Sequence, residues 1–153
     1  MKLYLVQHAK AASKEIDPAR SLTEEGLHDI KKVAAFIKPL ALSVDYLWHS
    51  SKKRAQQTAE FLVEVLTIKK EHNARDGLAP NDDVTAIEDQ IMSLKQDIMI
   101  VGHLPFLSKL VTLLLTGHDS PNTVAFKNAG IVCLDCADNQ WRIGWIIIPE
   151  ILG

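Results

Sequence analysis

The sequence predicts an α/β fold, a three-layer α/β/α sandwich in which helices cover both faces of one mixed, mostly parallel sheet. Two observations support this fold class. Short apolar runs alternate three times with amphipathic segments of helical spacing. The chain then ends in two apolar runs separated by Ala-Asp-Asn-Gln at residues 137–140, which is typical of a hairpin turn. With 153 residues and no visible linker or repeat, we expect a single domain over residues 1–153.

Composition narrows the class of protein. The chain has a net charge of -2, with 47% apolar and 24% charged residues, which is ordinary for a globular protein. This charge gives no case for nucleic acid, and no apolar run approaches the roughly 20 residues that cross a bilayer. Residues 1–3 lead directly into a strand, without the features of a signal peptide. We therefore expect a cytoplasmic protein with neither a nucleic-acid nor a membrane partner.

The first strand is predicted over residues 3–6, an apolar run that leads to His8. A polar loop over residues 11–20 follows. Thr23 is a plausible N-cap for the next helix, because two glutamates directly after it suit the positive end of the helix dipole. Apolar residues then recur at helical spacing until Pro39 marks the stop.

A second strand is predicted over residues 44–49, followed by a polar turn and an apolar helical stripe. Ser50 or Ser51 is expected to cap this helix, and Arg54 lies about one turn into it. A helix N-terminus with a hydroxyl and a guanidinium is a good anion site. Residues 68–83 are expected to be irregular, and the next helix is predicted to end near residue 94.

The third strand is predicted over residues 97–103 and has the continuous apolar run of a strand buried on both faces. A strongly apolar helix follows and ends at Gly117. Three further strands are expected at residues 123–126, 130–136 and 141–148. The two cysteines, Cys133 and Cys136, have C-x-x-C spacing, but on a strand this spacing points them to opposite faces. The position favours neither a redox motif nor a zinc site.

Two strand ends and one helix start carry the candidate chemistry. His8 and His103 each follow a buried strand, and Arg54 opens a helix after a third. In an open α/β sheet, groups in such places can converge outside the carboxyl ends of the strands. Two imidazoles and a guanidinium suit a tetrahedral phosphate better than a metal ion. A neutral imidazole is also a good nucleophile toward phosphorus. The alternative is a structural histidine at a strand end.

In the order of its motifs the chain resembles the histidine phosphatase superfamily, and in particular its short SixA-type phosphohistidine phosphatases. The family opens with a strand and Arg-His-Gly, matched by Gln-His-Ala at residues 7–9. Its Arg-x-Leu-Thr-x-x-Gly segment corresponds to residues 20–26, and its Ser-Pro-x-x-Arg-Ala-x-x-Thr segment to residues 50–58. Its Gly-His-x-Pro motif is matched at residues 102–105. The resemblance covers essentially the whole chain and implies a phosphoglycerate mutase-like fold.

The resemblance implies a two-step phosphatase reaction. His8 would be the nucleophile that becomes phosphorylated, and water would then release phosphate. Arg54 and His103 would hold the transferring phosphoryl group, with Gln7 and Ser50 also in contact with it. The implied substrate is a phosphohistidine on a signalling or phosphotransfer protein. No metal or organic cofactor is expected, and phosphate or sulfate should occupy the site.

The chain departs from the family pattern beside the nucleophile. Gln7 stands where the family has arginine, and its neutral hydrogen bonds are weaker than charged ones, so activity could be attenuated. Ala9 adds a Cβ where the family has glycine. Lys10 could restore charge, although a solvated surface lysine is the favoured interpretation. His49 could line the site.

The general acid has two candidates, Asp82 and Asp83, which could equally be helix caps. A leaving imidazole with a pKa of about 6.5 can be protonated near neutral pH without a dedicated acid. Two other functions remain open. One is a non-catalytic or weakened phosphate or phosphoprotein-binding module, and the other is a small-molecule phosphomonoesterase on the same fold.

Overall fold

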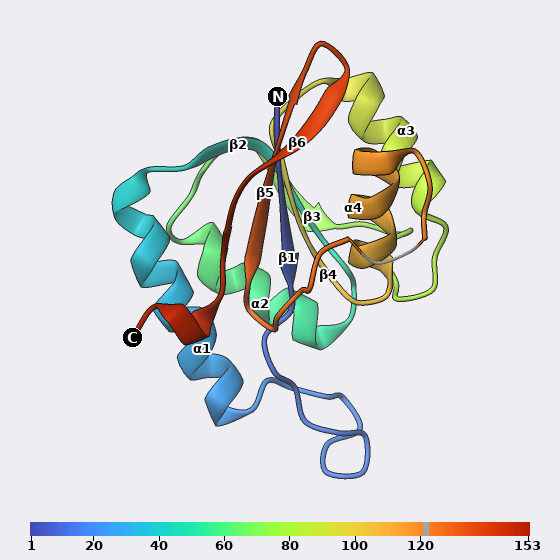
Figure 1. The fold of residues 1–153 in the computed structure, drawn as a ribbon. Helices are drawn as coiled ribbons and strands as arrows, with labels where there is room; N and C mark the ends of the chain where they lie inside the picture. Colours follow the sequence, from blue (N-terminus) through green and yellow to red (C-terminus); the bar gives the residue numbers. More distant parts are fainter. Residues whose placement is uncertain (121–122) are drawn as a thin grey trace.

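A six-stranded mixed sheet forms the centre of the protein, in a computed structural model that describes residues 1–120 and 123–153 (Figure 1). The strands are β1 (Lys2–Gln7), β2 (Ser43–His49), β3 (Thr67–Ala74), β4 (Ile98–Gly102), β5 (Ile131–Ala137) and β6 (Gln140–Ile147). Their order across the sheet is β3-β2-β4-β1-β5-β6. The first four strands run parallel to one another, β5 runs antiparallel to β1, and β6 runs antiparallel to β5. The predicted fold class is confirmed.

Helices cover both faces of this sheet, so that two apolar layers form. The helices are α1 (Glu24–Ile37), α2 (Lys53–Val63), α3 (Val84–Leu94) and α4 (Phe106–Thr116), with short 3-10 turns η1 (Lys38–Leu40) and η2 (Pro149–Ile151). One core cluster joins the sheet to α1 and α2, and the other joins its opposite face to α3 and α4. The strand β4 is buried along its whole length, as expected for a central strand with helices on both sides.

Strand register brings three loops to one rim of the sheet. Gln7 at the end of β1 pairs with Gly102 at the end of β4. On the other side of β4, His49 at the end of β2 pairs with Val101. The residues that follow these strand ends therefore emerge side by side. This rim is the carboxyl edge of the parallel strands, where open α/β sheets bind ligands.

Local signals placed most helix ends correctly. The hydroxyl of Thr23 caps α1 by accepting from the Gly26 N–H, Asp83 caps α3, and Gly117 ends α4 at a φ of 83°. The expected cap of α2 was wrong. Lys52 holds that position without a side-chain bond, and the hydroxyl of Ser50, two residues earlier, accepts from the Lys52 N–H before the helix begins.

Two segments differ from the prediction. Residues 68–83 were expected to be irregular, but Thr67–Ala74 forms β3, which pairs with β2 alone. This edge strand is mostly exposed, so it lacks the apolar run by which buried strands are recognised, and Lys69 and Lys70 are typical of a protected edge. Conversely, residues 123–126 form a loop rather than a strand. The buried Val124 contributes to the core from that loop without pairing in the sheet.

The C-terminal hairpin is confirmed. It turns at Asp138 and Asn139, both with positive φ, as primed hairpin turns require. Cys133 and Cys136 on β5 are free and pack against opposite core clusters, as their spacing predicted. Within the part of the chain that the structure describes, no helix is both long and apolar enough to span a bilayer.

Candidate active site

His8 leaves the end of β1 with its imidazole half-buried at the sheet rim. Its Nδ1 lies 2.7 Å from the carbonyl oxygen of Ala9. Since a carbonyl only accepts, Nδ1 carries the hydrogen and the neutral ring keeps its lone pair on Nε2. Burial, with a smaller contribution from the charge of Arg54, lowers the pKa of His8 to about 4. At neutral pH this side chain is therefore an uncharged imidazole with a free nucleophilic nitrogen.

His103 follows β4 and lies beside His8, with ring centroids 5.1 Å apart. Its Nε2 is 2.8 Å from the Ser50 hydroxyl oxygen, which also accepts from the backbone N–H of Lys52 at 3.2 Å. The ring is 1% exposed. Burial and then the charge of Arg54 lower the pKa of His103 to about 3. A bound anion would favour its protonated form, which can donate from both nitrogens.

Arg54 supplies a fixed cation from the first turn of α2. Burial, followed by the nearby charge of Arg20, lowers the pKa of its guanidinium, and its charge is felt by His8 and His103. Its Nε is buried and has no hydrogen-bond partner among the described residues. Nδ1 of His103 is likewise buried without a hydrogen-bond partner among the described residues. Two such groups beside a helix N-terminus are well suited to the oxygens of an anion.

Arg20 is a site residue that the sequence did not single out. Its positive charge contributes to lowering the pKa of His8, of Arg54 and of His103. It emerges from the loop before α1, with a φ of 53° and its Nε donating to the carbonyl of Ala12 at 3.0 Å. The available signal was its place at the head of the family motif at residues 20–26.

Two contacts hold the backbone around His8. The hydroxyl of Thr58 in α2 accepts from the Ala9 N–H at 2.9 Å and donates to the Arg54 carbonyl at 2.8 Å. The amide of Asn128 donates to the carbonyl of His8 at 2.9 Å. Thr58 thus ties the loop that follows His8 directly to the helix that carries Arg54. Thr58 belongs to the family motif at residues 50–58, but the motif alone did not predict this contact.

Together these side chains offer two neutral imidazoles and two guanidiniums at one rim, a donor set that suits a tetrahedral oxyanion. In the described part of the chain, no group of three or more His, Cys, Asp or Glu side chains is arranged to hold a metal ion.

Comparison with known proteins decides the family. The family model of the histidine phosphatase superfamily (branch 1) matches residues 3–79, about half of the chain. The chain belongs to this superfamily. The match contains His8, Arg20 and Arg54, three of the side chains brought together at the rim. A sequence relative supports the same family: phosphohistidine phosphatase SixA of Escherichia coli (strain K12) is 25% identical over 126 residues, 79% of this chain and 78% of that protein.

Solved structures of the superfamily share the fold. The protein histidine phosphatase SixA in complex with tungstate superposes with a TM-score of 0.87 over 100% of both chains, at 22% identity. A phosphoserine phosphatase from Entamoeba histolytica, in complex with 3-phosphoglyceric acid, superposes with a TM-score of 0.71 over 95% of both chains, at 17% identity. The phosphoglycerate mutase-like fold is thereby confirmed, and the superfamily and SixA similarities support a phosphatase.

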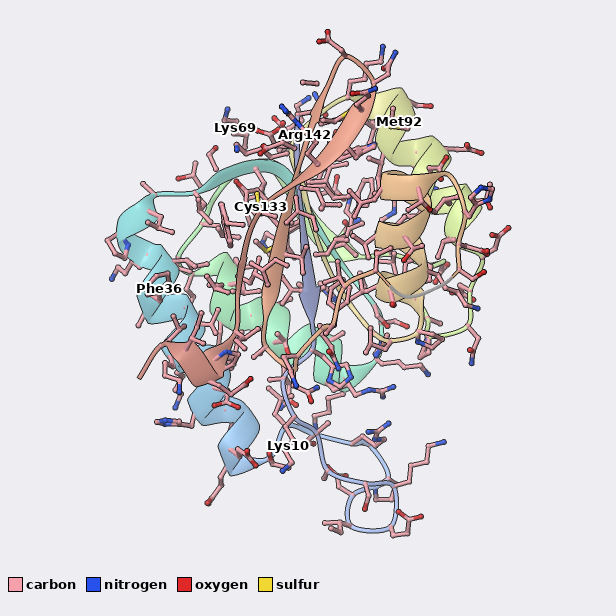
Figure 2. The ribbon with its side chains drawn as sticks, in the orientation of Figure 1. Lys10, Phe36, Lys69, Met92, Cys133 and Arg142 are labelled. Carbon is pink, nitrogen blue, oxygen red and sulfur yellow. The ribbon has the colours of Figure 1, made fainter. Side chains whose placement is uncertain are left out.

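The departures from the superfamily pattern lie directly beside His8. Gln7 is half-buried, and its Oε1 is buried without a hydrogen-bond partner in the described residues. Ala9 is fully buried, so its methyl group is accommodated without displacing the loop that Thr58 holds. Lys10 forms an ion pair with Glu25 at 2.6 Å, beside the start of α1 (Figure 2). Lys10 is therefore paired at the exposed start of α1 and does not take the place of the missing arginine.

The two candidate general acids have local structural contacts. The Asp82 carboxylate accepts from the Ala79 N–H at 2.8 Å, and Asp83 caps α3 by accepting from the Thr85 N–H at 2.9 Å. Hydrogen bonds with Thr85 lower the pKa of Asp83, which keeps it ionised. His49 directs its Nδ1 to the Ser50 carbonyl and lines a separate cavity between α2 and the β3 side of the sheet.

Proposed function

We propose that the protein is a phosphohistidine phosphatase that acts on signalling or phosphotransfer proteins in the cytoplasm through a phosphorylated His8. The observation that carries this proposal is the pairing of the neutral His8 with His103, 5.1 Å apart, beside two guanidiniums. Superfamily membership and the similarity to E. coli SixA support the same reaction class. A SixA structure holds tungstate, a tetrahedral oxyanion like phosphate.

In the first step, Nε2 of His8 attacks the phosphorus and the P–N bond to the substrate imidazole breaks. The phosphoryl group moves to His8, and the electron pair of the broken bond stays on the leaving imidazole. Arg54 and His103 stabilise the charge on the equatorial oxygens. The contact from Nδ1 of His8 to the Ala9 carbonyl stabilises the positive charge that develops on the ring. Water then attacks the phosphorus, His8 leaves, and inorganic phosphate is released.

The leaving group decides how much acid catalysis is needed. A free imidazole has a pKa of about 6.5. Once a phosphohistidine is protonated near neutral pH, its side chain can therefore leave the phosphoryl group as a neutral imidazole. Asp82 and Asp83 are the proposed candidates if a side chain supplies this proton. Their backbone contacts in the structure make solvent an equally good source.

The proposal is tested with a histidine phosphotransfer domain that has been phosphorylated with phosphoramidate. Wild-type protein should release phosphate and carry an acid-labile phosphoryl group, and His8→Ala should do neither. The exposed His72 in β3 provides a matched control, because His72→Ala removes an imidazole outside the site. Phosphate release that persists in His8→Ala would contradict a His8 intermediate.

Two specific observations support alternative functions. The position of Gln7 favours a weakened or non-catalytic phosphoprotein-binding module, which would bind the phosphorylated domain without releasing phosphate. The likeness in fold to a phosphoserine phosphatase favours a small-molecule phosphomonoesterase. Comparing rates on the phosphorylated domain, phosphoserine and an aryl phosphate separates these functions from the main proposal.

A further inference from the structure

The loop of residues 11–20, the Ile16 loop, projects from the rim where the strands end (Figure 1). Its neck is closed by a hydrogen bond from the Ala12 N–H to the Ser21 carbonyl at 2.8 Å. Inside the loop, the Asp17 carboxylate accepts two backbone N–H groups, including that of Ser21 at 3.0 Å. The loop is therefore internally braced, and a partner that contacts it would lose little affinity to ordering it.

This loop presents two side chains with opposite chemistry. The charge of Arg20 acts on the two histidines of the site, whereas Ile16 is 82% exposed. Another large apolar side chain, Leu104, is 39% exposed and directly follows His103. Single exposed apolar residues are common and need no explanation. These two differ because each sits on a segment that also delivers a charged or catalytic side chain to the pocket.

The surface next to Leu104 is hollowed. A cavity of about 470 Å³ lies there, lined by Leu104, Ser108, Thr123, Val124, Ala125 and Phe126. Its lining is mainly apolar, and it adjoins the segment that carries His103.

We propose that Ile16, Leu104 and the cavity beside Leu104 form a docking surface for the protein that carries the phosphohistidine, contacting apolar side chains around the phosphorylated residue. This inference rests on the proposed function. Charge complementarity favours this occupant, because Arg20, Arg54 and Lys52 at the same rim attract the negative phosphoryl group. A free sugar phosphate would satisfy the cations but leave the apolar surface uncovered.

A second copy of the chain is a poorer occupant of this surface. In a two-fold dimer each contact surface faces its own equivalent. Such a dimer would place Arg20, Lys52 and Arg54 of one copy near the same cations of the other, which is repulsive. A phosphorylated partner brings the opposite charge to the same place.

The test compares two substrates that share a P–N bond and differ in size. One is a histidine phosphotransfer domain phosphorylated with phosphoramidate, and the other is phosphoramidate itself. For Ile16→Ser and for Leu104→Ser, kcat/KM on the domain should fall about tenfold. A tenfold change corresponds to about 1.4 kcal/mol, less than full burial of such a side chain contributes. On phosphoramidate, kcat/KM should be unchanged in both variants.

Leu40→Ser is the matched control. Leu40 is 51% exposed but precedes β2, at the opposite end of the strand from His49, so neither substrate should respond. The docking surface is refuted if Ile16→Ser and Leu104→Ser leave the domain reaction unchanged, or slow both substrates equally. It is also refuted if wild-type protein hydrolyses phosphoramidate but not the domain. Hydrolysis of neither substrate would instead overturn the proposed function on which the surface depends.

Discussion

Arginine in place of Gln7 would add a third guanidinium to a pocket that already contains Arg20 and Arg54. Without an anion, three neighbouring cations repel one another, and we expect the Gln7→Arg protein to unfold at a lower temperature than wild type. With phosphate bound, the added charge should form a charged hydrogen bond. Such bonds contribute about 1.5–3 kcal/mol, which predicts phosphate binding about ten- to a hundredfold tighter.

The assay is calorimetric titration with phosphate, combined with thermal unfolding at increasing phosphate concentration and constant ionic strength. A ligand stabilises the folded state according to its concentration relative to Kd. The unfolding temperature of Gln7→Arg should therefore start below that of wild type and rise more steeply with phosphate concentration. Gln7→Met is the control, because it removes the amide, including the unpartnered Oε1, without adding charge. Equal phosphate affinity in wild type and Gln7→Arg would refute the reasoning, since Gln7 would then lie outside the pocket.

Three further predictions concern the support of the site. Thr58→Val removes the acceptor of the buried Ala9 N–H, so stability should fall by about 1–3 kcal/mol in urea unfolding and turnover should drop, whereas Thr58→Ser should keep turnover. Because the pKa of His8 is lowered to about 4 when folded, the unfolded chain binds more protons between that pH and about 6.5. Stability without phosphate should therefore decrease as pH falls through this range, and His8→Asn should flatten the dependence; an unchanged slope would contradict the burial of His8. Gly26→Ala would place a methyl carbon 2.1 Å from the Lys10 carbonyl oxygen, so we expect a loss of about 1–3 kcal/mol in urea unfolding, and unaltered stability would contradict this close approach.

The fold was predictable where burial leaves a periodic pattern. The apolar run of β4 and the stripes of α1 and α2 report which faces are covered, and they identified the layers. The edge strand β3 was missed because its side chains are mostly exposed and three of the eight residues are charged, so pairing with β2 is its main link to the sheet. Residues 123–126 show the converse. Val124 is apolar because it fills core space from a loop, which a sequence pattern does not distinguish from a strand.

The candidate site was predictable to the extent that strand ends define it. The positions of His8 and His103 follow from one topological rule, since both stand directly after parallel neighbours. Arg20 was not identified because its approach depends on the fold of a loop, with a positive φ and a contact to Ala12 that no periodicity encodes. The same limit applies to Asn128, which reaches the His8 carbonyl from 120 residues away in the sequence.

The charge of the pocket bears on which substrate it favours. With Gln7 in place of arginine, the proposed reaction would rely on Arg20 and Arg54 to stabilise the transferring phosphoryl group. A phosphohistidine loses a weakly basic imidazole, whereas a phosphomonoester of an alcohol must lose a far more basic oxygen. The transition state of ester cleavage therefore needs more stabilisation and a proton donor. Asp82 and Asp83, the candidate donors, are held by backbone contacts. Loss of one guanidinium should therefore reduce ester hydrolysis more than phosphohistidine hydrolysis, so Gln7→Arg should raise kcat/KM on phosphoserine by a larger factor than on a phosphorylated histidine domain. An equal gain on both substrates would mean that this position acts on phosphate binding alone and contributes nothing to the choice of leaving group.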